Sequence, residues 1–140
     1  PIKDLEGFGS LFHVVNDIER IGDHAENFAD CARRRKEKGI KFSKEAQKEL
    51  GDMLEMVTKM VRLSIETFHH KEDEHIRKIN DLEILVDEKE RELQQKHIDR
   101  LTQNACTPEA GMIFSDVVSG LERVADHTTN IAHGIANIGE

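Results

Sequence analysis

The chain has little of several residue types, and each shortage argues against a class of protein. Trp and Tyr are absent and Phe occurs six times in 140 residues, which removes the usual aromatic platforms on which nucleobases stack. Lys and Arg number 20 against 28 Asp and Glu, and the net charge of -8 argues further against a nucleic-acid partner. The two cysteines, Cys31 and Cys106, are too few for a disulfide framework and lack the spacing of a CxxC metal site.

Long apolar runs and targeting segments are also missing. No apolar run approaches the roughly 18 to 20 residues that a membrane-spanning helix needs. There is no pattern of a signal peptide, and the scarcity of cysteine agrees with a reducing compartment, so we expect a cytoplasmic protein. The chain begins at Pro1 instead of an initiator Met, and we expect it to be a piece of something longer.

Apolar residues at three-to-four spacing predict long helices. The first helix is expected to begin between Asp4 and Ser10 and to end near Lys38, where Gly39 suits the C′ position. Ser43 is the predicted N-cap of the second helix. The core positions predicted for the second and third helices are Leu50, Met53, Leu54, Val57, Met60, Val61, Phe68, Ile79, Leu82, Val86, Leu93 and Leu101.

The remaining helix boundaries follow from capping signals. The second helix is predicted to break between His69 and Asp73, with Asp73 as a cap of the third. Thr107, Pro108 and Glu109 give a capping hydroxyl, a proline at N1 and an acid in the first turn, so a fourth helix is predicted from here to near Gly139. Four helices of about 28 to 32 residues joined by short links predict an all-α, antiparallel up-down helical bundle.

A polar repeat is the part of the sequence that bears most directly on function. The string NDIERIGDHAENFAD at residues 16–30 recurs in the same register as SGLERVADHTTNIAH at residues 119–133. Six residue types recur at matched offsets, which packing alone does not explain. In the two copies they are Glu19, Arg20, Asp23, His24, Asn27 and Ala29, and Glu122, Arg123, Asp126, His127, Asn130 and Ala132.

The repeated acids predict a metal site. Two carboxylates at i and i+4 on a helix repel each other unless a positive charge lies between them. Carboxylate and amide oxygens suit Mg, Mn, Ca or iron, and a nearby His extends the range to zinc. The candidate ligands are Glu19, Asp23, Glu122 and Asp126, followed by the weaker candidates Asn27, Asn130 and Asn16.

Two arrangements of these ligands remain open. On antiparallel helices the two motifs lie at about the same height, so they could face each other across one site or build one site each. His24 and His127 point about 140° away from the acids and are expected to make interhelical or surface hydrogen bonds. The basic segment from Arg33 to Lys44 is interpreted as a helix C-terminus followed by a solvated turn, with contact to an anionic partner or membrane face as the alternative.

The two strings resemble the paired E(D)xxxD signatures of PhoU-type domains, which are helical-bundle repeats associated with bacterial phosphate-uptake control. The segment from Lys96 to Ala132 is also similar to the PhoU-like tail of bacterial sodium/phosphate cotransporters. The resemblance implies that residues 43–138 form one complete three-helix repeat, and that residues 1–38 correspond to the last helix of a preceding repeat. The whole chain, residues 1–140, is then a single PhoU-like domain.

The resemblance also implies a function, a cofactor and partners. Multinuclear iron or zinc clusters would lie on the carboxylates of Glu19, Asp23, Glu122 and Asp126. The expected function is a metal-binding, non-enzymatic domain that regulates a membrane phosphate transporter, as the tail of a sodium/phosphate cotransporter at the inner face of the membrane. The transporter could be part of the same chain or separate, and a second copy of the chain could cover an exposed apolar face.

Three alternatives are kept beside this interpretation. The chain could be a stand-alone PhoU-type regulator of phosphate signalling. It could be a carboxylate-bridged metalloprotein of the ferritin-like type, although the motif helices lack a Glu-x-x-His pair. Finally, it could be a plain interaction bundle in which Glu19 pairs with Arg123, or Glu122 with Arg20.

Overall fold

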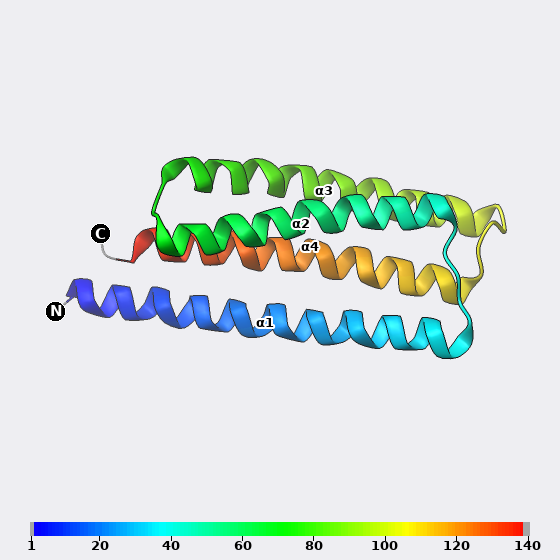
Figure 1. The fold of residues 1–140 in the computed structure, drawn as a ribbon, viewed down its shortest axis with the longest axis horizontal. Coiled ribbons are helices and arrows are strands. Elements are labelled where there is room, and N and C mark those ends of the chain that lie inside the picture. The colour runs from blue at the N-terminus through cyan, green and yellow to red at the C-terminus, as the bar shows by residue number, and fades with distance from the viewer. Residues whose placement is uncertain (1, 139–140) are drawn as a thin grey trace.

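A computed structural model describes residues 2–138 of the chain, except for the side chains at positions 2–4 and 6. The order of elements is α1 (Ile2–Lys38), α2 (Lys44–His69), α3 (Asp73–Thr102) and α4 (Pro108–Asn137). The helices alternate in direction, and no strand occurs in the described part (Figure 1). The predicted all-α, antiparallel up-down bundle is therefore confirmed.

Capping residues fix three of the helix ends as the sequence predicts. The Ser43 hydroxyl accepts a hydrogen bond from the amide of Ala46 at 3.1 Å, and the Thr107 hydroxyl accepts one from the amide of Ala110 at 3.1 Å. Each satisfies a backbone donor that the first turn of a helix leaves free. Gly39 follows α1 with a φ of 64°, in the left-handed region that glycine adopts without a steric penalty.

Two helix starts differ from the prediction, and one predicted helix end lies outside the described residues. Helix α1 begins at Ile2 instead of between Asp4 and Ser10, because glycines weaken a helix by roughly 1 kcal/mol each without interrupting its hydrogen bonds. Asp73 lies in the first turn of α3, whose N-cap is Glu72 and has no side-chain capping bond. Gly139, the predicted end of the last helix, lies outside the described residues.

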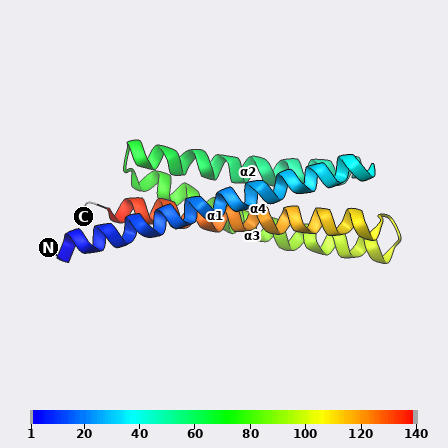
Figure 2. The ribbon, with the colours of Figure 1, turned by 90° about the horizontal axis from the view of Figure 1, so that it is seen from below.

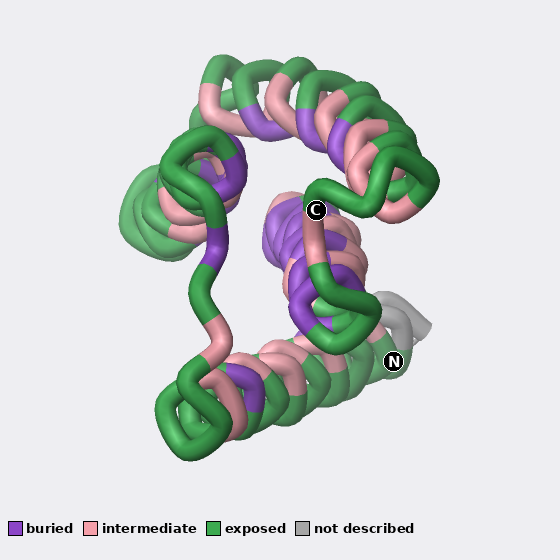
Figure 3. Tube along the Cα trace, turned by 90° about the vertical axis from the view of Figure 1, so that its right-hand side faces the viewer, coloured by how far each residue is buried: buried purple, intermediate pink, exposed green. Residues whose placement is uncertain are grey.

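The four helices pack unequally. Helices α2, α3 and α4 each contact the other two, whereas the backbone of α1 runs beside α4 and not beside α2 or α3 (Figures 1 and 3). The fold is therefore a three-helix bundle with one further helix laid along α4. Fully buried side chains of the three-helix bundle include Met53, Met60, Ile79, Leu93 and Val118.

Two predicted core residues are on the surface. The side chains of Leu54 and Phe68 in α2 are 52% and 53% exposed, because α1 does not extend over this helix. A charged residue is buried instead: Glu49 is 5% exposed and accepts a hydrogen bond from Arg100 of α3 at 2.6 Å. This ion pair joins α2 to α3 near one end of the bundle, where it satisfies one oxygen of the buried carboxylate.

Helix α1 leaves an apolar stripe uncovered. Val14 and Cys31 are buried, Val14 against α4, but most of the helix faces outward (Figure 3). Six apolar side chains between 46% and 79% exposed recur at helical spacing along its N-terminal half: Leu5, Phe8, Leu11, Phe12, Val15 and Ile18. A contiguous apolar surface of this kind marks a contact site in many proteins. None of the four helices is long and apolar enough over its described residues to cross a bilayer.

Candidate metal centre

The acids of the second repeat copy face α3. Glu122 and Asp126 of α4 and Asp87 of α3 each offer a carboxylate oxygen, and these three oxygens lie within 4.8 Å of one another. All three residues are half-buried. Each follows a buried apolar residue in the sequence, namely Val86, Leu121 or Ala125, which places the carboxylates at the border between the core and solvent.

Two more acids of α3 belong to the same carboxylate cluster, Glu83 and Glu90. Burial and hydrogen bonding to Asp126 raise the pKa of Glu83 to about 7. Burial, followed by hydrogen bonding to Asp126 and its charge, raises the pKa of Glu122 to about 8. Burial and the negative charge of Asp87 likewise raise the pKa of Glu90. Glu83, Glu90 and Glu122 therefore hold protons at a pH where isolated carboxyl groups have lost them.

The residues of this cluster fit a cation. All the donor atoms are carboxylate oxygens, which suit hard or intermediate ions such as Mg, Mn, Ca or iron. The raised pKa values reflect burial first and the neighbouring acids second, and a bound cation would offset both costs to the ionised carboxylates as a proton does. Among the described residues no His or Cys joins this group, so the donor set favours these ions over zinc.

The acids of the first repeat copy do not belong to this carboxylate cluster. Glu19 and Asp23 are exposed and lie on the side of α1 that faces away from α4, and no group of three potential ligands in the described chain includes them. Of the two arrangements that the sequence leaves open, the shared site is not formed. Asn16 and Asn130 are also exposed, and Asn27 lines a groove between α1 and α4.

The two repeat histidines lie where α1 crosses α4, as expected from their offset. Their rings stack with centroids 5.8 Å apart, and Nδ1 of His127 is 2.8 Å from a carboxylate oxygen of Asp17. The predicted interhelical hydrogen bonding is thus confirmed for His127. Burial, followed by the positive charges of His127 and Arg123, lowers the pKa of His24. Neither of the two repeat ion pairs of the plain-bundle alternative, Glu19 with Arg123 and Glu122 with Arg20, forms among the described residues.

Comparison with known families shows the family to which the chain belongs. A PhoU domain model matches residues 50–135, more than half of the chain and most of α2 to α4. The chain belongs to the PhoU domain family. This bears out the resemblance seen in the two repeat strings.

Two curated relatives agree with the assignment. A phosphate-specific transport system accessory protein PhoU homolog 1 from Thermotoga maritima is 27% identical over 137 residues, which cover 98% of this chain and 58% of the relative. A PhoU homolog of the same description from a Burkholderia species is 24% identical over 133 residues, which cover 93% of this chain and 55% of the relative. The chain thus spans little more than half the length of the relatives that it matches.

Three acids of this PhoU domain were missed in the sequence: Glu83, Asp87 and Glu90. The signal was present, because Glu83 and Asp87 have the same ExxxD spacing as the repeat acids. They stand in a highly charged helix without the repeated Arg, His and Asn, and an isolated ExxxD is usually solvated surface charge. Only the pairing of α3 with α4 distinguishes them from the other acids of α3.

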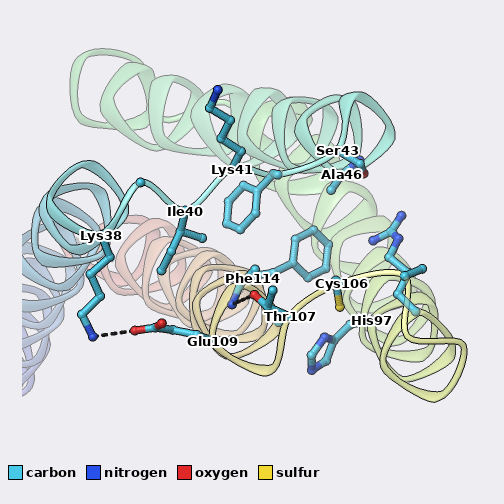
Figure 4. Close-up of a pocket in the computed structure, with 16 residues that line it drawn as sticks. Lys38, Ile40, Lys41, Ser43, Ala46, His97, Cys106, Thr107, Glu109 and Phe114 are labelled. Atoms are coloured by element: carbon cyan, nitrogen blue, oxygen red, sulfur yellow. Dashed lines mark hydrogen bonds and ion pairs between the residues drawn. The ribbon is translucent and has the colours of Figure 1, made fainter.

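The end of the PhoU domain holds a separate cavity of about 480 Å³ (Figure 4). Phe42 and Phe114 meet edge to face in it, with ring centroids 6.0 Å apart. Lys38 and Glu109 form an ion pair across its rim. Cys106 lines it as a free thiol, so the cavity sits where the α1–α2 and α3–α4 connections close the bundle, far along the helices from the carboxylate cluster.

Proposed function

We propose that this PhoU domain is a metal-binding regulatory module of phosphate transport. The observation that supports metal binding is the cluster of Asp87, Glu122 and Asp126, whose oxygens lie within 4.8 Å of one another. The surroundings of this cluster raise the pKa of Glu122 to about 8. Support for the transport role comes from the family and from two relatives that are both named as phosphate-specific transport system accessory proteins.

The relatives favour a stand-alone accessory protein over a cotransporter tail. Both are described as accessory proteins of a transport system, which is the alternative in the sequence interpretation. The sodium/phosphate cotransporter link rests on the resemblance of the segment from Lys96 to Ala132 alone. We therefore place the domain in the cytoplasm beside a separate membrane phosphate transporter, at the inner face of the membrane.

The carboxylate cluster is suited to hold two helices together. Glu122 and Asp126 project from α4, and Asp87 projects from α3 between Glu83 and Glu90. A cation bound there would supply the positive charge that offsets their repulsion. With a metal of this kind the carboxylates would fix the position of α3 against α4, and so the surface that the bundle presents to a transporter.

We propose no enzymatic activity for this centre. The ferritin-like alternative uses a Glu-x-x-His motif from the bundle core, whereas the described ligand group consists of carboxylates. The regulatory role needs only a difference in helix packing between the metal-bound and metal-free forms.

The repeat itself supplies a matched control for the metal site. Glu122→Gln/Asp126→Asn removes two carboxyl groups from the cluster, and Glu19→Gln/Asp23→Asn makes the same change at the equivalent exposed positions of α1. After chelator treatment and calorimetric titration with Mn²⁺ or Fe²⁺, the first variant is expected to lose binding by at least tenfold while the second keeps it. Equal binding by all three proteins would overturn the proposed site.

The transport role has a test in cells. Deleting the gene in its own host and measuring uptake of radiolabelled phosphate in phosphate-rich medium is expected to reveal a loss of control over uptake. The wild-type gene restores control, and Glu122→Gln/Asp126→Asn does not. Uptake that is unchanged by the deletion contradicts the transport role without bearing on metal binding.

A second copy of the chain is proposed to cover the apolar stripe of α1. Its six side chains from Leu5 to Ile18 are 46% to 79% exposed, which costs free energy in water that association recovers. The stripe lies opposite the α4 contact, so the second copy would not disturb the three-helix bundle. Its helices would also approach Glu19 and Asp23, the acids that have no facing ligand in the described chain.

A further inference from the structure

The crossing of α1 and α4 has local twofold symmetry. His24 and His127 hold the same offset in the two copies of the repeat, and their rings stack with centroids 5.8 Å apart. Helices α1 and α4, which carry them, cross each other (Figure 2). Equivalent residues of the two copies differ by 103 in number. The first side of the His24–His127 pair is the one where Asp17 lies beside His127, and the second side is the one where Gly120 and His24 line a groove. Each residue on one side therefore has a counterpart on the other side.

Asp17 and Gly120 are one pair of counterparts at which the two sides differ. On the first side, Asp17 reaches Nδ1 of His127 at 2.8 Å. On the second side, Gly120 has no side chain to reach His24, and a groove of about 500 Å³ lies between α1 and α4. The polar side chains that line it include Arg33, Arg34, Arg123, His24, Asn27 and Ser119.

The groove is richer in positive than in negative charge, although the whole chain carries -8. Its two acids each lie near one arginine: Asp30 accepts a hydrogen bond from Arg33 at 3.0 Å, and Asp116 is 3.9 Å from Arg34. Across the described residues, no carboxylate lies within ion-pair distance of Arg123. The first side keeps only one of these three arginines, because the counterpart of Arg123 is Arg20, whereas those of Arg33 and Arg34 are Ala136 and Asn137.

We propose that this groove binds the phosphate group of an anionic ligand. Guanidinium groups bind phosphate oxygens in a bidentate fork, and Arg33, Arg34 and Arg123 line the groove from two helices. Asn27 and Ser119 add neutral hydrogen-bond donors. The volume exceeds that of orthophosphate, so the groove accommodates either free phosphate with water or the phosphate of a nucleotide. The proposal rests on the proposed function only for the choice of orthophosphate as the first probe.

The groove lies close in sequence to the carboxylate cluster, because both include residues of the same turn of α4. Arg123 directly follows Glu122 in α4, and its positive charge acts on His24 in the groove and on Glu90 in the cluster. A bound phosphate group would neutralise part of that charge.

The test uses the chelator-treated full chain, so that phosphate cannot bind through a metal. Calorimetric titrations with orthophosphate, sulfate and AMP, each in chloride of matched ionic strength, are compared for wild type, Arg33→Gln/Arg123→Gln and Arg62→Gln/Arg77→Gln. The last variant loses the same charge from exposed positions of α2 and α3. We expect one phosphate or AMP per groove, at least tenfold weaker binding after the groove substitutions, and no change in the control.

The AMP and orthophosphate titrations distinguish the two classes of ligand. Binding of AMP without orthophosphate identifies a phosphate ester as the ligand, and binding of orthophosphate identifies the free ion. Absence of binding by both ligands at millimolar concentration, or equal loss in the groove variant and its control, overturns the proposal. Either result leaves the metal titration unaffected, because that experiment depends on Glu122 and Asp126.

Discussion

Glu122 and Asp126 carry the same side chains at the same offsets as Glu19 and Asp23, yet their surroundings differ. The α4 pair is half-buried against Asp87 of α3, and the α1 pair is exposed. The low local dielectric and the neighbouring acids raise the pKa of Glu122 in the first environment. The pKa of a repeat acid and its grouping with other carboxylates therefore depend on the side chains of the helix packed against it.

The raised pKa values predict how the metal-free protein responds to pH. Glu122 and Glu83 titrate near 8 and 7 in the fold, above the 4.5 of the unfolded chain, so the folded state binds more protons. Their contribution to stability is complete below about pH 4.5 and is lost as the pH rises to about 8. After discounting for solvent at half-exposed groups, each shift amounts to ~1 kcal/mol.

Thermal unfolding of chelated protein between pH 5 and 8 measures this effect. The melting temperature of wild type is expected to fall across the range, and Glu122→Gln is expected to flatten the slope. Asp23→Asn is the control, because it removes an acid from the exposed copy. A slope that Glu122→Gln leaves unchanged would contradict the protonated cluster.

At the scale of the helices, α1 is held to α4 by close approach at glycines. A Cβ atom added at Gly134 would lie 2.8 Å from a methyl carbon of Val14, and one added at Gly120 would lie 2.6 Å from the ring of Phe28. Gly22 in α1 has nothing within 4 Å of such an atom. The two α4 glycines thus permit the contact, whereas Gly22 only weakens its helix.

Alanine substitutions at these glycines are predicted to act in opposite directions. Gly134→Ala forces Val14, a stiff and buried residue, to move, and the overpacking is expected to outweigh the gain in helix propensity by ~1 kcal/mol. Gly22→Ala is expected to stabilise by up to ~1 kcal/mol. Urea unfolding followed by circular dichroism measures both, and stabilisation by Gly134→Ala would argue against the close contact of α1 with α4.

At the scale of the whole molecule, α1 is an outlying helix with an apolar stripe. It adds one helix to a three-helix bundle and leaves its own outer face uncovered. A single helix on the surface of a bundle can bury only one face, so residues at the opposite face depend on another molecule or segment for burial.

The prediction at this scale is a dimer of the chain. Sedimentation at micromolar concentration is expected to give a dimer for wild type and a monomer for Phe8→Ser/Phe12→Ser, whose side chains are 73% and 79% exposed. Ile84→Ser/Ile98→Ser removes comparably exposed apolar side chains from α3 and is expected to remain dimeric. A wild-type monomer at all concentrations contradicts coverage by a second copy.

Helix capping and apolar spacing allowed much of the fold to be predicted from the sequence. Ser43, Thr107 and Gly39 act where their side chains or backbone freedom meet the needs of a helix end, and apolar spacing identified Met53, Ile79 and Leu93 as core. These features depend on neighbours within a few residues. Leu54 and Phe68 could not be placed in this way, because their exposure depends on where α1 lies.

The sequence by itself determined that two pairs of acids exist at i and i+4, Glu19 with Asp23 and Glu122 with Asp126, that each pair lies on a long helix, and that the repeat histidines point away from them. Only the tertiary structure decided which of the two acid pairs lies against further carboxylates. Both have the same spacing, but α4 is packed inside the three-helix bundle against Asp87, whereas α1 lies outside it. A ligand set that spans two helices is defined by their packing, and packing joins residues whose relation is not encoded in local spacing.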